Sequence, residues 1–316
     1  MTPTDPTVSV VIPAYNRAAT IRAAAESVLR QTWTDFELLI IDDCSTDSTF
    51  EEAKALDDPR IRLLRNARNR GAGGTRNAGI AAARGRWIAF QDSDDEWLPR
   101  KLEKQMARLL APGANLPAAY CGMLVIGTIR DRLDGAGGRP AIRYIPRPEI
   151  ASVEGDLLPT LIRGNVVSTQ TLVVRRDVIQ ALGGFDESFR ALEDRELAIR
   201  LAQAGPIACV DEPLVLQRFS PNSLTRDLAL QAEAKTRMVE KHLETMRRYP
   251  DQLAGFYYSI AYDHRLAGNV PAARAMLARA RAIRPFEPRF WLMEARLLVP
   301  PRGARPGQKA GRPRRR

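Results

Sequence analysis

Residues 8–43 read VSVVIPAYNRAATIRAAAESVLRQTWTDFELLIIDD. A short β-branched run, Val8–Ile12, ends at a proline. It is followed by apolar residues at helical spacing over Thr20–Arg30 and by a second apolar run, Phe36–Ile41. Strand, helix and strand in this order indicate a right-handed βαβ unit with parallel strands. Because both runs are apolar apart from Ser9 and Glu37, we expect helices to cover both faces of the sheet.

The same alternation continues toward the middle of the chain. Ile61–Leu64 is typical of a strand, Ala78–Ala83 of a helix and Trp87–Phe90 of a further strand, and Pro99 opens another helical pattern. Strands alternating with helices predict the α/β class, with a mainly parallel sheet flanked by helices.

The later part of the chain is less regular. Tyr120–Ile129 and Gln170–Arg175 are typical of strands, whereas the pattern after Arg226 is helical only. Ala261–Ala282 has the form helix, Gly-Asn turn, helix, and resembles one tetratricopeptide-type pair. We therefore predict an α/β domain over residues 1–225, a helical C-terminal extension over 226–300 and a disordered basic tail over 301–316.

The composition excludes several classes of protein. Of the 316 residues, 45% are hydrophobic and 27% are charged, values that exclude bulk disorder. The formal net charge is +11, but residues 301–316 hold seven Lys and Arg and no acid, so removing them leaves +4. A mildly basic folded part gives no reason to expect a specific nucleic-acid partner. The tail itself suits contact with an anionic membrane surface.

The sequence also predicts a cellular location. It has no run of about 18 apolar residues and no apolar signal segment at its polar N-terminus. Cys44, Cys121 and Cys209 are odd in number and far apart, which argues against a disulfide framework and a zinc site. We expect a cytoplasmic protein, with the tail giving peripheral contact at the inner face of the membrane.

Three acidic residues follow the strand at Trp87–Phe90. Asp92, Asp94 and Asp95 lie within four residues, where their charges repel one another unless a cation or several donors compensate. Mg²⁺ or Mn²⁺ would supply that compensation, because these ions bind a few carboxylates together with phosphate oxygens and water. A solvated acidic turn that caps the next helix is the alternative.

Other polar segments also stand where ligands bind in such sheets, beyond the carboxyl ends of the strands. Asp42 and Asp43 could accept hydrogen bonds from a base or a ribose, or form an Asx turn. Glu193 and Asp194 precede a helical run and could supply a general base or interact with the helix dipole. Gly71–Arg76 could face a diphosphate or be a tight loop before a helix.

Taken together, these segments resemble family-2 glycosyltransferases of the GT-A (Rossmann-like) fold. The resemblance rests on several motifs in order: Val8–Arg17, Phe36–Asp47, Asn69–Gly79, Asp92–Asp95, and Gly183–Glu187 followed by Glu193-Asp194. It spans about residues 7–220 and says little about the sugar.

The resemblance implies a role for each matched residue. Pro13, Tyr15 and Asn16 would line the nucleotide pocket, with Asp43 on a uracil-type base and Asp42 beside it. Asp92 and Asp94 would contact the ribose and the metal-diphosphate, and Asp95 would share or take the metal role. Asp94 and Asp95 are the metal ligands named first, but the choice is left open among Asp92, Asp94 and Asp95. Arg76 would approach the diphosphate, and Asp194 would be the catalytic base.

The resemblance further implies an inverting enzyme of the hexosyltransferase type that uses Mg²⁺ or Mn²⁺. It would act on a UDP-type nucleotide-sugar and a glycan or lipid-linked acceptor, in cell-surface glycan biosynthesis. Cys44 stands where glycine or asparagine is commoner, Arg218–Thr225 lacks histidine, and the Gln-x-x-Arg-Trp motif of processive synthases is absent. A sugar-phosphate nucleotidyltransferase and a non-enzymatic binding protein that uses the helices and the tail are the alternatives.

Overall fold

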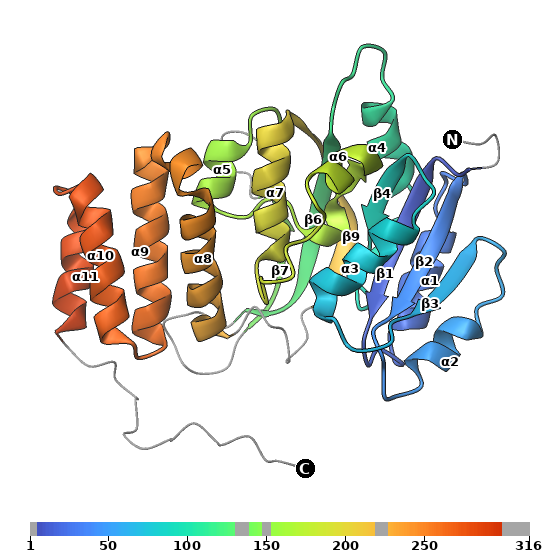
Figure 1. The fold of residues 1–316 in the computed structure, drawn as a ribbon, viewed down its shortest axis with the longest axis horizontal. Helices are drawn as coiled ribbons and strands as arrows, with labels where there is room; N and C mark the ends of the chain where they lie inside the picture. Colours follow the sequence, from blue (N-terminus) through green and yellow to red (C-terminus); the bar gives the residue numbers. More distant parts are fainter. Residues whose placement is uncertain (1–4, 130–138, 147–152, 219–226, 299–316) are drawn as a thin grey trace. The chain divides into compact units, whose positions relative to one another are not determined.

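The computed structural model describes residues 5–129, 139–146, 153–218 and 227–298. The chain divides into two compact units, residues 1–224 and 225–316 (Figure 1). The first contains a nine-stranded sheet with helices, and the described residues of the second are helical. The predicted basic tail at 301–316 lies outside the described residues, as do residues 219–225 of the segment that lacks histidine.

The first half of the sheet is parallel and confirms the predicted βαβ pattern. Its strands lie side by side in the order β3-β2-β1-β4. Their bounds are β1 Val8–Ala14, β2 Phe36–Asp42, β3 Ile61–Arg65 and β4 Trp87–Phe90. β1 and β2 are buried almost throughout, as expected for strands that are covered on both faces.

The prediction that β1 ends before Pro13 is wrong. The strand continues to Ala14, and Pro13 stands opposite Ile41 of β2. On the other side, the pairing with β4 stops at Val11, which stands opposite Phe90. Pro13 therefore has a neighbouring strand on one side only, and a proline is tolerated at such a local edge because its missing N–H breaks no ladder bond there.

The second half of the sheet is mixed. β8 pairs antiparallel with β4 and with β6, and β6 pairs parallel with β9. β5 and β7 add antiparallel pairs to β9 and β6. The bounds are β5 Glu96–Trp97, β6 Ala118–Ile129, β7 Arg139–Ile145, β8 Val173–Arg175 and β9 Ile207–Arg218, and Thr169–Thr171 forms a 3₁₀ turn where a strand was expected.

Helix α3, Gly71–Ala82, corrects the view of the glycine segment as a loop. Its glycines are needed for close packing. A Cβ atom at Gly79 would lie 2.3 Å from Cγ1 of Val11, and one at Gly74 would lie 2.8 Å from Cβ of Arg70. Gly79 lets α3 lie directly against β1, whereas Gly74 makes room for the side chains of Arg70 and Glu187.

The remaining helices of the first unit connect and cover the strands (Figure 1). They are α1 Ile21–Leu29, α2 Thr49–Lys54, α4 Lys101–Leu109, α5 Leu158–Arg163, α6 Arg176–Ala181 and α7 Glu193–Ala204. α7 begins at Glu193, so the Glu193-Asp194 pair lies in its first turn and not before it.

The second unit contains α8 Leu228–Arg247, α9 Pro250–Leu266, α10 Val270–Ile283 and α11 Pro288–Leu297. The predicted helix pair is formed by α9 and α10, although α9 starts well before Ala261. Gly268 supplies a positive φ of 80° in the turn, and the side chain of Asn269 accepts a hydrogen bond from Ala272 N and caps α10. None of the described helices has the length and apolar character needed to cross a membrane.

Candidate functional site

The carboxyl ends of β1, β2 and β4 meet at one edge of the sheet, and the loops that follow them are bonded together. Asp43 N donates to Ala14 O at 2.7 Å, and Gln91 N donates to Val11 O at 3.0 Å. Parallel neighbours necessarily present their carboxyl ends on the same side. The structure thus brings together the three polar segments that the sequence singled out at strand ends.

The loop after β1 is fastened to the loop after β2 by Asn16. This residue has a φ of 52°, a conformation that asparagine adopts more readily than most residues. Its side-chain oxygen accepts from Thr46 N at 2.9 Å, and its backbone N–H donates to Ser45 Oγ at 3.0 Å. Tyr15 beside it remains half-exposed, and Pro13 is partly buried. Asn16 therefore shapes the loop and leaves the Tyr15 ring free for a ligand to contact.

Asp43 is buried and caps helix α3. It accepts hydrogen bonds from Asn66 Nδ2 at 2.7 Å, Arg70 N at 2.9 Å and Gly71 N at 2.9 Å. A carboxylate offers about four acceptor positions, so three donors leave one for a ligand. The predicted contact with a base is compatible with this geometry and stays a prediction.

Asp42 has a different environment from Asp43. It is fully buried, forms an ion pair with Arg65 Nε at 3.0 Å and accepts from the backbone N–H of Ser45. Its bonds hold the loop that carries Asp43. This arrangement favours a supporting role beside the nucleotide pocket over direct contact with a ligand.

Asp94 is the most exposed carboxylate of the acidic run after β4, and it faces a cation. Its side chain is 33% exposed, and its Oδ2 lies 3.6 Å from Nε of Arg17 in the loop after β1. Burial, and then repulsion by Asp92, raises the pKa of Asp94, although Arg17 opposes this. Positive charge is therefore favoured near Asp94, and Arg17 is a site residue that the sequence did not reveal.

Asp95 points into the protein. It is buried, and its two oxygens accept from Gln170 Nε2 at 3.0 Å and from Arg218 N at 3.3 Å. Burial raises its pKa well above the usual value, and the negative charges of Asp92 and Asp94 add to the effect. These bonds tie the acidic run to β9, and the metal role predicted for Asp95 finds no support in this geometry.

Arg76 links two halves of the site and is not directed at open space. Its buried guanidinium bonds to Asp92 at 2.7 Å and to Glu193 at 3.0 Å, and lies 5.4 Å from the centre of the Phe185 ring. The two carboxylates raise its pKa against the effect of burial. The bridge uses two of the five N–H donors of the guanidinium, and the buried Nε forms no hydrogen bond with the described residues. The expected contact with a diphosphate stays a prediction.

Asp194 occupies a setting suited to a general base. It accepts from Asn165 Nδ2 at 2.7 Å and from the backbone N–H of Arg195 at 2.7 Å. Burial raises its pKa to about 7, and the adjacent charge of Glu193 contributes to the rise. A carboxylate with a pKa near the working pH can take up a proton effectively, and proton transfer by such a group is typical of enzyme sites.

The acidic residues meet part of the requirement for a divalent metal. Within the described ranges, no three His, Cys, Asp or Glu side chains form a ready-made metal site. Mg²⁺ and Mn²⁺ are commonly held by one or two carboxylates, with phosphate and water completing the shell. Asp94, with the partly exposed Asp92 beside it, fits such an ion, whereas Asp95 does not.

Several supporting residues escaped prediction. Arg17 belongs to a segment that the sequence had singled out, so a search there for counter-charges could have found it. Glu193 was a candidate from the sequence, but its ion pair with Arg76 was not expected. Asn165 and Gln170 carry no recognisable pattern, and only the fold brings them to Asp194 and Asp95.

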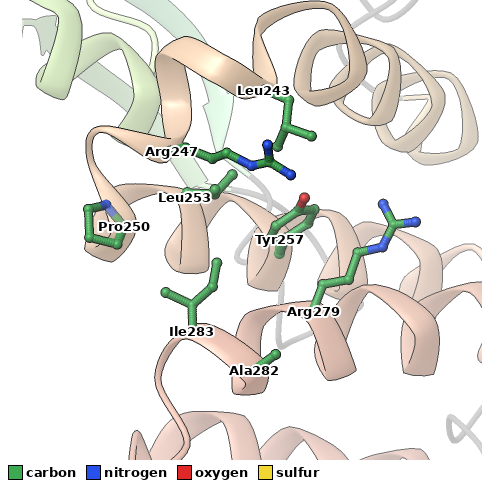
Figure 2. A pocket seen from close by; sticks show the side chains of 8 residues that line it. All are labelled: Leu243, Arg247, Pro250, Leu253, Tyr257, Arg279, Ala282 and Ile283. Atoms are coloured by element: carbon green, nitrogen blue, oxygen red, sulfur yellow. The ribbon is translucent and has the colours of Figure 1, made fainter.

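A separate cavity of about 520 Å³ lies within the C-terminal unit (Figure 2). Side chains of α8, α9 and α10 face it, among them Arg247, Tyr257 and Arg279, and its other lining residues are apolar. The lining contains no carboxylate and no histidine, and Tyr257 is its one side chain with a hydroxyl.

Comparison with known proteins adds independent findings. Glycosyl transferase family 2 matches residues 9–161. The chain is 37% identical to the succinoglycan biosynthesis protein ExoO of Rhizobium meliloti (strain 1021) over 71% of this chain and 64% of ExoO. It is 46% identical to the Escherichia coli UDP-Glc:alpha-D-GlcNAc-diphosphoundecaprenol beta-1,3-glucosyltransferase WfgD over 34% of this chain and 42% of WfgD. Less than two thirds of the length of either relative is therefore matched.

Two further proteins are matched over a larger share of their own length. The putative glycosyltransferase EpsE of Bacillus subtilis (strain 168) is 31% identical over 63% of this chain and 68% of EpsE. The mannosyltransferase PcManGT from Pyrobaculum calidifontis, solved with GDP-Man and Mn²⁺, superposes with a TM-score of 0.60 at 19% identity over 93% of this chain and 85% of that one. The latter similarity concerns the fold and confirms its predicted class. With the match over residues 9–161 and the similarity to EpsE, these findings show that the chain belongs to glycosyl transferase family 2.

Proposed function

We propose that this protein transfers a sugar from a UDP-sugar to a hydroxyl of a lipid-linked glycan, with inversion and metal assistance, during assembly of a cell-surface polysaccharide. The relatives support the setting, since one is a succinoglycan biosynthesis protein and another carries a UDP-Glc donor and a diphosphoundecaprenol acceptor in its name. Family membership leaves no support for the nucleotidyltransferase and non-enzymatic alternatives.

The loops after β1 and β2 are assigned to the nucleoside. The exposed ring of Tyr15 offers a stacking surface, and Pro13 lies next to it in β1. Asp43 keeps one acceptor position for a base N–H, which suits a uracil. Asn16 and Asp42 hold the two loops in place.

The acidic run after β4 is assigned to the ribose and the diphosphate of the donor. Asp94 would hold Mg²⁺ or Mn²⁺, and Arg17, at 3.6 Å from Asp94, would meet a diphosphate oxygen. The ion, when bound, supplies charge neutralisation for the departing diphosphate. Asp92 bonds to Arg76 through Oδ1 and is assigned to the ribose through its other oxygen.

Asp194 carries the proposal. A partly buried carboxylate whose pKa is raised to about 7 lies in the first turn of α7, and the Arg76 bridge connects its neighbour Glu193 to Asp92. It would accept the proton of the acceptor hydroxyl as that oxygen attacks the anomeric carbon and the diphosphate leaves. A base on the acceptor side and stabilisation of the leaving group on the donor side favour direct displacement, which inverts the anomeric centre.

The test compares Asp194→Asn with the wild-type protein on a panel of UDP-sugars with Mn²⁺. We expect the variant to keep its affinity for the donor in calorimetry and to lose about 10²–10⁴-fold in turnover, measured as UDP release with a lipid-linked acceptor. Asp177→Asn is the matched control, since Asp177 is an exposed carboxylate of the same unit. Unchanged turnover in Asp194→Asn would remove Asp194 from the reaction, and an α-linked product from an α-linked donor would exclude inversion.

A further inference from the structure

Residues 286–298 expose a large amount of apolar surface. Among the described residues, eight large apolar side chains are exposed, and four of them lie in this stretch. They are Phe286 at 91%, Trp291 at 49%, Leu292 at 53% and Leu298 at 72%. Single exposed apolar residues are ordinary, but a contiguous group marks an interaction site. Trp291 and Leu292 lie in α11, while Phe286 precedes the helix and Leu298 follows it. We call these four residues the outer face of α11.

Helix α11 has apolar residues on two sides. Phe290, Met293 and Leu297 are buried, and the Phe290 ring stacks on Tyr258 of α9 at 5.3 Å between centres. Trp291 and Leu298 are seven residues apart, so they share a side of the helix that differs from the buried one. The inner side already attaches α11 to its own unit, and the outer face is not required for that contact.

The Trp291 side chain is held in one orientation although about half of it is exposed. Its Nε1 donates to Pro285 O at 2.7 Å, and the guanidinium of Arg281 lies 3.7 Å from the centre of its ring. An exposed tryptophan with a fixed orientation loses little conformational freedom on binding. Its combination of a ring and a polar N–H is the one favoured at the boundary between water and lipid.

The surroundings of the outer face are positively charged. Residues 270–298 contain six arginines and two glutamates. Both glutamates are paired with arginines, Glu287 with Arg284 and Arg289 and Glu294 with Arg281. The sequence that follows adds seven Lys and Arg without an acid over 301–316. An apolar face bordered by arginines is typical of segments that lie on anionic lipid.

We propose that the outer face of α11 docks on an anionic lipid bilayer. Phe286, Trp291, Leu292 and Leu298 enter the boundary between headgroups and acyl chains, while the arginines of residues 270–298 meet lipid phosphates. A second copy of the chain fits this face poorly, because two such arginine-bordered faces would repel each other. The proposal does not depend on the transferase reaction, although a lipid-linked acceptor would lie at the same surface.

The test uses the full chain and vesicles of phosphatidylcholine with or without phosphatidylglycerol. The variant Phe286→Ser with Leu292→Ser removes two apolar side chains for which exposure predicts little effect on folding, and circular dichroism checks this. Leu110→Ser is the matched control, since Leu110 is 45% exposed and belongs to the other unit. We expect the wild-type protein and the control variant to co-sediment with the anionic vesicles. The double variant should partition onto these vesicles at least about tenfold less than the wild-type protein.

The fluorescence of Trp291 gives a second measurement. Anionic vesicles should shift the emission of the wild-type protein to shorter wavelength, and Trp291→Phe should abolish the shift. The proposal is overturned if the double variant binds like wild type, if deleting residues 301–316 alone removes all binding, or if sedimentation velocity shows a dimer that the double substitution dissociates. UDP release with a water-soluble acceptor reports the reaction separately, so loss of vesicle binding and loss of catalysis can be told apart.

Discussion

The assignment of Asp194 as the base predicts a specific dependence of activity on pH. With a pKa of about 7, Asp194 is mostly protonated below neutrality and cannot accept a proton from the acceptor. We expect kcat/KM to rise with pH up to about 7 and to fall about tenfold for each pH unit below that value. The assay is UDP release from a UDP-sugar measured between about pH 5 and pH 8.5 at saturating Mn²⁺.

The pH at which kcat/KM reaches half its maximum is the midpoint of this profile. Two substitutions should move it in opposite directions. The charge of Glu193 raises the pKa of Asp194, whereas the hydrogen bond from Asn165 lowers it. Glu193→Gln should therefore shift the midpoint to lower pH, and Asn165→Ala should shift it to higher pH. A flat profile for the wild-type protein, or shifts of equal direction in the two variants, would refute the reasoning.

The same pKa has a consequence for stability. The pKa of Asp194 lies at about 7 in the folded protein, against its ordinary value of 3.8. Between these values the folded state keeps a proton that the unfolded chain has lost, so the free energy of unfolding decreases as pH rises through this window. The difference corresponds to on the order of 4 kcal/mol above neutral pH. Urea denaturation of wild type and Asp194→Asn at about pH 5 and pH 8 measures it, and the variant should lose most of the pH dependence.

Three further predictions concern the metal, the arginine bridge and the helix packing. Asp94→Ala should raise the Mn²⁺ concentration needed for half-maximal activity by about tenfold or more. Asp95→Asn should leave this concentration unchanged. Equal effects of the two variants in a Mn²⁺ titration would refute the separate assignments. Arg76→Ala leaves Asp92 and Glu193 without their common partner and should cost about 3–5 kcal/mol in denaturant unfolding, with Arg76→Lys closer to wild type. Gly79→Ala places a Cβ at 2.3 Å from Val11 and should destabilise by about 1–3 kcal/mol, whereas the same change at Gly255, with nothing within 4 Å, should not destabilise.

The sheet was predictable because its signals are local. Each of the first four strands is rich in apolar residues, and the polar residues that follow β1, β2 and β4 were expected at one edge. The extension of β1 past Pro13 was not predictable from the run itself, because it depends on where the neighbouring β4 stops.

The roles within the site were predictable only in part. The sequence drew attention to Asp94 and Asp194 by their charge and position, and their roles stay predictions. It could not show that Asp95 bonds to Gln170 or that Arg76 bonds to Glu193, because these partners lie far along the chain. The glycines of α3 looked like a loop for a similar reason, since the need for a small residue at Gly79 arises from Val11 of another element.

The Arg76 bridge joins the donor side and the acceptor side of the reaction through one shared charge. When a ligand draws Asp92 away, the guanidinium interacts more strongly with Glu193, and the proton affinity of the neighbouring Asp194 must change. By thermodynamic reciprocity, protonation of Asp194 must then alter donor affinity to the same extent. Under the roles proposed for Asp92 and Asp194, donor occupancy and the proton affinity of the base would thus be coupled across three segments of the chain.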